Sequence, residues 1–218
     1  MKHIGAIFDW DGVVVDSARL HVESWRQLAD EEGHPPPAVP GLGGLGLKNE
    51  IVIGKLLGWT QDPAEMRRLM HRKEILFRER LARGGIEAIP GVVAFLRQLK
   101  AAGIPAAIGS SAPRANVVAC IESLGLHGLF AASVTAEDVA HGKPDPEVFL
   151  KCAAALGLPP GDCVVFEDAP AGVEAARAGG IKVIGVLSTR TLEQLPGAVR
   201  YIHSFAEISP ATLREVLG

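Results

Sequence analysis

Short apolar runs alternate along this chain with segments of helical periodicity. The runs are rich in valine and isoleucine and cover residues 4–8, 104–108, 163–166 and 182–187. In the intervening segment 91–102 the apolar positions fall on one helical stripe, and Gly103 follows where a helix is expected to end. This alternation predicts an α/β fold: a Rossmann-like parallel sheet with helices on both faces.

Residues 18–84 break this rhythm. The pattern there predicts helices over 17–32, 48–57 and 63–83, with a loop rich in proline and glycine over 34–46 and no strand. A small helical domain inserted after the first strand would form a cap, with hinges near 14–17 and at Gly84–Gly85. We therefore predict an α/β core made of residues 1–17 and 85–218, and a helical cap made of residues 18–84.

The loop contains a glycine motif that we do not interpret as a nucleotide site. Residues 41–46 match the GxGxxG pattern, but no strand precedes them and no βαβ unit surrounds them. A loop of the cap is the better interpretation.

Composition excludes several classes of partner. Of the 218 residues, 48% are hydrophobic, which is enough to bury a core, and the net charge of -3 includes no basic run. We expect a small-molecule partner, with no nucleic acid and no membrane, whereas the oligomeric state is not readable. The first apolar run is too short for a signal peptide, so we expect a cytoplasmic protein. The three cysteines have no metal-binding spacing, and we expect them to be reduced and buried.

Two carboxylates follow the first strand, in the segment Phe8–Asp9–Trp10–Asp11–Gly12. Open α/β sheets bind ligands at the carboxyl ends of their strands. Two acids at this spacing repel each other, and a cation would hold them together. Oxygen ligands without a nearby histidine or cysteine favour Mg²⁺.

Three later segments add to this pattern. Ser110 ends a strand ahead of a helix that Pro113 is suited to start, so the hydroxyl and the nearby amides could hold a phosphate. Lys143 lies between Gly142 and Pro144, a rigid frame that suits an ammonium facing a fixed anion. A further apolar strand ends in two more acids, Glu167 and Asp168.

Taken together, these segments resemble the four motifs of the haloacid dehalogenase superfamily, and within it the small-molecule phosphatases and β-phosphoglucomutases with a helical cap. The resemblance implies that Asp9 is a nucleophile that also binds Mg²⁺. It implies that Asp11 is the general acid and base and offers its carbonyl to the metal. Ser110 and Lys143 would hold the phosphoryl oxygens, and Asp168 and Glu167 would complete the metal site.

Six residues are candidates for substrate binding: His21, Trp25, Lys48, Asn49, Ser111 and Arg114. His21 and Trp25 have offsets from Asp9 like those in the mutases, although a packed helix explains the pair equally well. The mutases carry a cap pattern similar to Lys-Gly-x-x-Arg-Glu, whose cations bind a second phosphate. Here Leu45 and Asn49 replace both cations, and a neutral amide cannot replace a guanidinium on phosphate.

We therefore predict a Mg²⁺-dependent phosphatase, a phosphoric monoester hydrolase that acts on a small phosphorylated metabolite such as a sugar phosphate through a phosphoaspartate. The alternatives are a phosphosugar mutase of the β-phosphoglucomutase type and a catalytically silent binding protein on the same fold. Dehalogenases fit less well, because they lack the second acid and the metal site. A phosphonate hydrolase would need a Schiff-base lysine with a depressed pKa, which the sequence around Lys48 and Lys55 does not provide.

Overall fold

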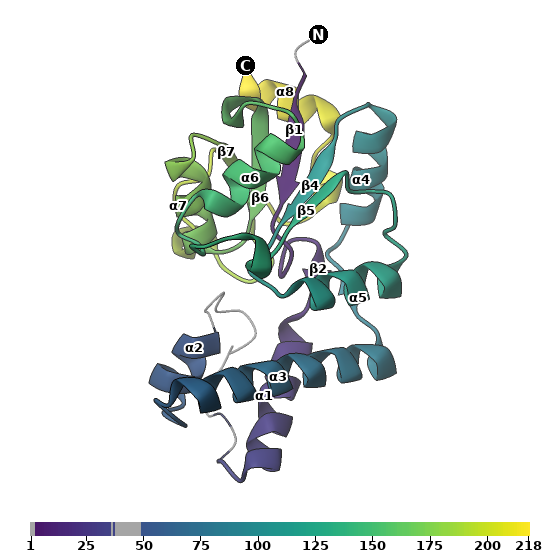
Figure 1. Cartoon of the computed structure of the whole chain (residues 1–218). Coiled ribbons are helices and arrows are strands. Elements are labelled where there is room, and N and C mark those ends of the chain that lie inside the picture. Colours follow the sequence, from purple (N-terminus) through teal and green to yellow (C-terminus); the bar gives the residue numbers. More distant parts are fainter. Residues whose placement is uncertain (1–2, 36, 38–48) are drawn as a thin grey trace.

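The structure, a computed structural model, describes residues 3–35, 37 and 49–218. Six parallel strands form its main sheet in the order β5-β4-β1-β6-β7-β8 (Figure 1). The strands are β1 (Gly5–Phe8), β4 (Ala106–Gly109), β5 (Ala132–Val134), β6 (Cys163–Glu167), β7 (Lys182–Val186) and β8 (Arg200–Ile202). β1 therefore lies in the middle of the sheet, between β4 and β6.

Helices cover both faces of this sheet. One face carries α4 (Val92–Ala101), α5 (Arg114–Leu124) and α8 (Pro210–Leu217), and the other carries α6 (Glu147–Ala155) and α7 (Pro170–Ala178). Successive strand residues point to opposite faces, so β1 sends Phe8 into one hydrophobic cluster and Ile7 into the other. The predicted α/β fold class is confirmed.

The first of these clusters contains a group of packed aromatic rings. Phe8 and Phe166, from neighbouring strands, stack with ring centroids 4.7 Å apart, and both rings contact Phe95 and Phe205. All four side chains are buried. This packing fixes the ends of β1 and β6, the strands that precede Asp9 and Asp168.

The inserted segment is helical in its described part. It contains α1 (Ala18–Glu32), α2 (Asn49–Ile51), a π-helical turn (Val52–Leu56) and α3 (Pro63–Gly84). Figure 1 shows α1 and α3 side by side at the end of the molecule opposite the two termini. The helices pack through a separate cluster that includes Trp25, Leu28, Leu69 and Leu76. The division of the chain into core and cap domains at residues 17 and 85 stays a prediction, and the glycine motif at 41–46 lies outside the described residues.

A short antiparallel ribbon joins the inserted segment to the rest of the fold. It consists of β2 (Val15–Asp16), which lies within the first predicted hinge, and β3 (Glu87–Ala88), which follows the second. Each strand has only two residues, too few for a periodic pattern to reveal. The sequence did not predict this ribbon.

Several other elements differ from expectation. The second predicted strand starts later, at Ala106, because Pro105 has no N–H for the ladder, although its carbonyl accepts the Ala6 N–H at 3.0 Å. The edge strands β5 and β8 were not predicted, since each has only three residues and is partly exposed. The helix expected over 48–57 consists of α2 and the π-helical turn. No helix among the described residues has both the length and the apolar character that a membrane span requires.

The three cysteines provide a test of core packing. Burial raises the pKa of the Cys120 and Cys152 thiols to about 12 and that of Cys163 to about 11. The thiolate is the reactive form, so we expect no thiol to react with Ellman's reagent at pH 8 in the folded protein. All three should react in urea. Rapid labelling of one thiol before unfolding would contradict the packing described for that cysteine.

Candidate active site

Three neighbouring strands bring polar side chains to one edge of the sheet. Asp9 follows β1, Ser110 follows β4, and Glu167 and Asp168 stand at the end of β6. The strands are parallel, so their carboxyl ends meet, and the Asp9 N–H donates to the Phe166 carbonyl at 3.0 Å. The sheet order thus brings together residues that lie more than a hundred positions apart in sequence.

Lys143 links the acids of two strands. Its Nζ lies 2.7 Å from Oδ1 of Asp9 and 2.7 Å from Oε1 of Glu167, and the side chain is 8% exposed. Burial opposes the charge on this lysine, but the carboxylates of Asp9 and Glu167 outweigh it and hold its pKa above the usual range. Lys143 is therefore a fixed cation between two carboxylates.

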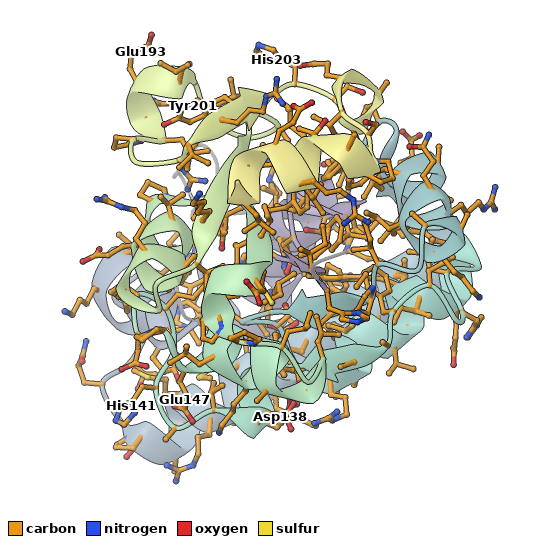
Figure 2. The ribbon with its side chains drawn as sticks, turned by 90° about the horizontal axis from the view of Figure 1, so that it is seen from above. Asp138, His141, Glu147, Glu193, Tyr201 and His203 are labelled. Atoms are coloured by element: carbon orange, nitrogen blue, oxygen red, sulfur yellow. The ribbon has the colours of Figure 1, made fainter. Side chains whose placement is uncertain are left out.

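The turn that carries Lys143 is held from the outside by Glu147. Oε2 of Glu147 accepts the backbone N–H groups of Ala140 and His141 at 3.0 and 2.9 Å. The Asp145 carboxylate accepts the N–H of Glu147 at 2.9 Å. Figure 2 shows His141 and Glu147 next to each other at the rim of the molecule. These contacts hold the backbone of the turn, while the Lys143 side chain points inward to Asp9 and Glu167.

The acids at this edge suit a divalent cation. Carboxylate oxygens of Asp9, Glu167 and Asp168 lie within 4.8 Å of one another, and all three residues are buried. The Lys143 ammonium and the Arg190 guanidinium, which lies 3.8 Å from Oδ2 of Asp168, leave one of the three negative charges without compensation. The donors are hard oxygens, which Mg²⁺ prefers. In Glu167, Oε1 already binds Lys143 and Oε2 accepts the Ala169 N–H, so Asp9 and Asp168 are the more accessible ligands.

The remaining negative charge, together with burial, raises the pKa of two of these acids. Burial, together with the charge of Glu167, raises the pKa of Asp9 well above its usual range despite the Lys143 ammonium. The same two causes raise the pKa of Asp168 to about 7. Without a cation, both groups hold a proton more tightly than exposed aspartates do.

Two glycines permit the close approach of these segments. A Cβ on Gly172 would lie 1.6 Å from Oε1 of Glu167, and one on Gly12 would lie 2.2 Å from Oδ2 of Asp168. Gly12 also has a φ of +80°, which other residues rarely adopt. Any side chain at either position would displace a carboxylate of the site.

The loop after β7 orients Asp168. The Thr189 hydroxyl donates to Oδ2 of Asp168, and the Arg190 guanidinium donates to the Asp168 carbonyl at 3.0 Å. The Ser188 hydroxyl donates to the Gly12 carbonyl. None of these three residues was predicted, because a polar loop without a motif gives no signal of a site.

Asp11 is held by residues at the start of the inserted segment. Ser17 donates its hydroxyl to Oδ1 of Asp11 at 2.5 Å, and Nε2 of His21 lies 3.4 Å from the same oxygen. Burial alone would raise the pKa of the Asp11 carboxyl, but the hydrogen bonds from His21 and Ser17 outweigh it and lower that pKa. The other ring nitrogen of His21, Nδ1, lies 2.7 Å from Nζ of Lys73 on α3.

Lys73 and its neighbour Glu74 extend this contact along α3. Nζ of Lys73 donates to Oε1 of Glu74 at 2.9 Å, and the Asn49 amide donates to the same oxygen at 2.7 Å. The Asn116 amide of α5 donates to Oε2 of Glu74 at 2.5 Å. Lys73 is only 2% exposed. These buried contacts were not predicted, although Lys73 interrupts an apolar stripe of α3 between Leu69 and Phe77, which is a detectable signal.

A cavity of about 380 Å³ lies between the buried side chains of His21, Lys73 and Glu74 and the acids of the sheet edge. The predicted site residues Asp9, Asp11, Ser110, Lys143, Glu167, Asp168, His21, Trp25, Asn49 and Ser111 all line it. Arg114 does not: it is about half exposed and pairs with Asp138 at 2.5 Å. Lys48 lies outside the described residues.

The expected phosphate cradle at the start of α5 is only partly open. The Ser110 hydroxyl accepts the Ala112 N–H at 2.9 Å, and the first helical N–H, that of Arg114, donates to the Glu137 carboxylate. That amide is therefore not free for a ligand. The Ser110 hydroxyl can still donate, because its observed bond uses a lone pair.

Comparison with known proteins identifies the family. Residues 5–180 match the family model for haloacid dehalogenase-like hydrolases. The chain belongs to this family. The resemblance seen in the four motifs is thereby confirmed, as is the prediction of a hydrolase of the phosphatase type.

Relatives in this family carry several names. A chloroplastic 5-amino-6-(5-phospho-D-ribitylamino)uracil phosphatase of Arabidopsis thaliana is 36% identical over 98% of this chain, which spans only 57% of that protein. Hexitol phosphatase A of Escherichia coli is 36% identical over 96% of the chain and 94% of its own length. β-Phosphoglucomutase of Bacillus subtilis is 32% identical, with 83% and 81% covered.

Solved structures of the family share the whole fold. A family IA hydrolase from Entamoeba histolytica superimposes with a TM-score of 0.88 at 26% identity, covering 98% of this chain and 99% of that one. The inserted helices and the parallel sheet are thus arranged as in a known haloacid dehalogenase-like hydrolase.

The acids of this hydrolase predict a pH-dependent response to Mg²⁺. Because the pKa of Asp168 is raised to about 7 from an ordinary 3.8, its protonation stabilises the folded state fully below about pH 4, and this contribution is lost as the pH rises through 7. Mg²⁺ competes with that proton. We expect 10 mM Mg²⁺ to raise the melting temperature by a few degrees at pH 8 and by much less at pH 5.

Asp168→Asn is the matched control, because it removes one charge at nearly constant shape. This variant should lose most of the Mg²⁺ effect at pH 8, as measured by differential scanning calorimetry. A Mg²⁺ effect of equal size at both pH values, or one that Asp168→Asn retains in full, would contradict the proposed ligand.

Proposed function

We propose that this protein is a Mg²⁺-dependent phosphatase that removes phosphate from a small phosphorylated metabolite through a phosphoaspartate on Asp9. The observation that carries this proposal is the position of Lys143, which binds Asp9 and Glu167 at 2.7 Å each on the sheet edge that also carries Ser110. A carboxylate nucleophile beside a fixed cation is suited to attack an anionic phosphate, which would otherwise repel it.

In the first step, Asp9 attacks the phosphorus atom and the bond from phosphorus to the ester oxygen breaks. Asp11 donates its proton to that oxygen, so the leaving group departs as a neutral alcohol. Lys143 and the Ser110 hydroxyl stabilise the negative charge on the phosphoryl oxygens in the transition state.

In the second step, water attacks the phosphorus atom of the phosphoaspartate. Asp11, now a carboxylate, takes a proton from that water, and the bond from phosphorus to Asp9 breaks to release inorganic phosphate. Ser17 and His21 stabilise the carboxylate form of Asp11, which is the form that this step needs.

The metal is assigned to the acids at the sheet edge. Asp9 and Asp168 would hold Mg²⁺ through carboxylate oxygens, Asp11 would offer its carbonyl, and Glu167 would support the site through Lys143. When bound, Mg²⁺ supplies positive charge next to the transferred phosphoryl group.

The residues that line the cavity support the proposal that the substrate is a polar metabolite of moderate size. Beyond the catalytic residues, it is lined by Trp25, Val52 and Met70, which give an apolar wall, and by Asn49 and Glu50, which give polar contacts. A mixture of this kind suits the carbon face and hydroxyl groups of a sugar or polyol. The similarity to hexitol phosphatase A supports the same substrate class.

The roles of Asp9 and Asp11 can be separated by substitution. Asp9→Asn removes the nucleophile, so no phosphoenzyme should form with any substrate. Asp11→Asn keeps the nucleophile but removes the acid and base. With p-nitrophenyl phosphate, whose leaving group needs little protonation, Asp11→Asn should accumulate an acyl phosphate on Asp9 while turnover falls by at least about 100-fold.

Mass spectrometry of the intact protein and its peptides after mixing with substrate and Mg²⁺ measures both outcomes. EDTA should abolish the modification of Asp11→Asn. Phosphate found on Ser110 or Lys143, or normal turnover by Asp9→Asn, would refute the mechanism.

A second candidate is a phosphosugar mutase, which the similarity to β-phosphoglucomutase favours. A mutase must bind a second phosphate at the far end of the cavity. Among the described residues there, the Asn49 amide binds Glu74, and Lys73 is already paired with the same carboxylate. These groups offer no cation that is free to bind a phosphate.

We therefore expect no mutase activity. With β-glucose 1-phosphate and a catalytic amount of glucose 1,6-bisphosphate, a coupled assay for glucose 6-phosphate should stay at background while inorganic phosphate is released. Formation of glucose 6-phosphate at a rate similar to that of phosphate release would instead establish the mutase.

A further inference from the structure

One amide of α5 meets two charged side chains of α3. Asn116 is 2% exposed, and its Nδ2 donates to Oε2 of Glu74 at 2.5 Å while its Oδ1 accepts from the Arg78 guanidinium at 2.7 Å. Glu74 and Arg78 are four residues apart and so lie on one face of α3. A carboxylate only accepts and a guanidinium only donates, so these partners fix the orientation of the amide.

This contact joins α3 to the sheet-bound part of the fold. Asn116 belongs to the helix that starts just after Ser110, whereas Glu74 belongs to the inserted segment. Figure 1 shows α5 next to α3, between that helix and the sheet. The amide therefore reports whether α3 is docked against α5.

Glu74 also binds Lys73, through its other carboxylate oxygen. While Oε2 binds Asn116, Oε1 accepts from Nζ of Lys73 at 2.9 Å. A buried ammonium needs a charged partner, and no other described carboxylate forms an ion pair with Lys73. Glu74 is thus the carboxylate that holds the Lys73 ammonium, which also lies over the rings of Trp25 and Phe77.

Lys73 in turn determines which ring nitrogen of His21 accepts a hydrogen bond and which one carries the proton. An ammonium can only donate, so Nδ1 of His21, which lies 2.7 Å from Nζ, must accept. The imidazole proton is then on Nε2, which faces Oδ1 of Asp11 at 3.4 Å. The chain runs without interruption from Asn116 to the candidate acid and base.

We propose that Glu74 and Asn116 are positioning residues for Asp11, acting through Lys73 and His21, so that Asp11 is aligned for catalysis when α3 is docked on α5. This inference rests on the proposed phosphatase mechanism. It adds to that mechanism two residues whose hydrogen bonds reach neither Asp9 nor Asp11 directly, and it assigns a function to the buried ion pair of α3.

The test uses Glu74→Gln, which keeps the shape of the side chain but removes its charge, together with Asn116→Ala and the double variant. The matched control is Glu65→Gln, an exposed glutamate of α3 that pairs with Arg68. With p-nitrophenyl phosphate and Mg²⁺, the first step needs little acid, so misplacement of Asp11 should slow the second step. We expect kcat to fall on the order of 10-fold to 100-fold and KM to fall with it.

The readout specific to positioning is the steady-state fraction of phosphoenzyme, measured by rapid acid quench and mass spectrometry. It should rise in Glu74→Gln and Asn116→Ala and stay at the wild-type value in Glu65→Gln. The double variant should be no worse than the more severe single variant, because both changes interrupt one chain. If Asn116→Ala does not fold, the isosteric Glu74→Gln decides the test by itself.

Two results would overturn the inference: a phosphoenzyme fraction at the wild-type value in both single variants, or a lower kcat with no accumulation and an unchanged KM, which indicates structural damage alone. In either case, a wild-type enzyme that forms phosphoenzyme on Asp9 leaves the phosphatase mechanism intact. A wild-type enzyme that forms none overturns both proposals.

Discussion

The site depends on one ammonium group buried among acids. Lys143 pairs with Asp9 and Glu167, and without it three carboxylates would lie within 4.8 Å of one another in a buried region. Breaking a buried pair of this kind typically destabilises a protein by about 3–5 kcal/mol. Lys143 and Arg190, which lies 3.8 Å from Oδ2 of Asp168, supply two positive charges against three acids, so the site keeps a net negative charge. A divalent cation held by Asp9 and Asp168, as we propose, would compensate that charge.

This arrangement constrains the rest of the fold. The acids come from the ends of β1 and β6, and the stacked rings of Phe8 and Phe166, in the hydrophobic core, hold those strand ends together. From the side, glycine at positions 12 and 172 lets loops approach the carboxylates. The core packing and the small residues near the site therefore serve one purpose, which is to hold like charges closer together than they would lie in water.

The sequence predicted the parts of this design that depend on local pattern. Acids after apolar runs revealed Asp9 and Asp168, since a strand and its end are adjacent in sequence. Interactions between distant segments could not be predicted in the same way. In the sequence Asn116 has no feature that separates it from other helix residues, because its partner Glu74 lies on the distant helix α3. Arg114, which was expected to bind substrate, pairs instead with Asp138. The short strands β5 and β8 could not be predicted, because three residues are too few to show a periodic pattern.

In the proposed mechanism, hydrolysis and phosphoryl transfer to a second sugar share the phosphoaspartate, so the α3 end of the cavity would decide between them. Transfer requires cations that bind a second phosphate, and water as the acceptor requires none. Among the described residues, the polar groups on that side are committed to one another: Asn49 and Lys73 both bind Glu74, and Glu74 binds Asn116. A carboxylate at the centre of this cluster would repel a second phosphate. Among the described residues, the contacts that we propose to align Asp11 would therefore also favour water as the phosphoryl acceptor.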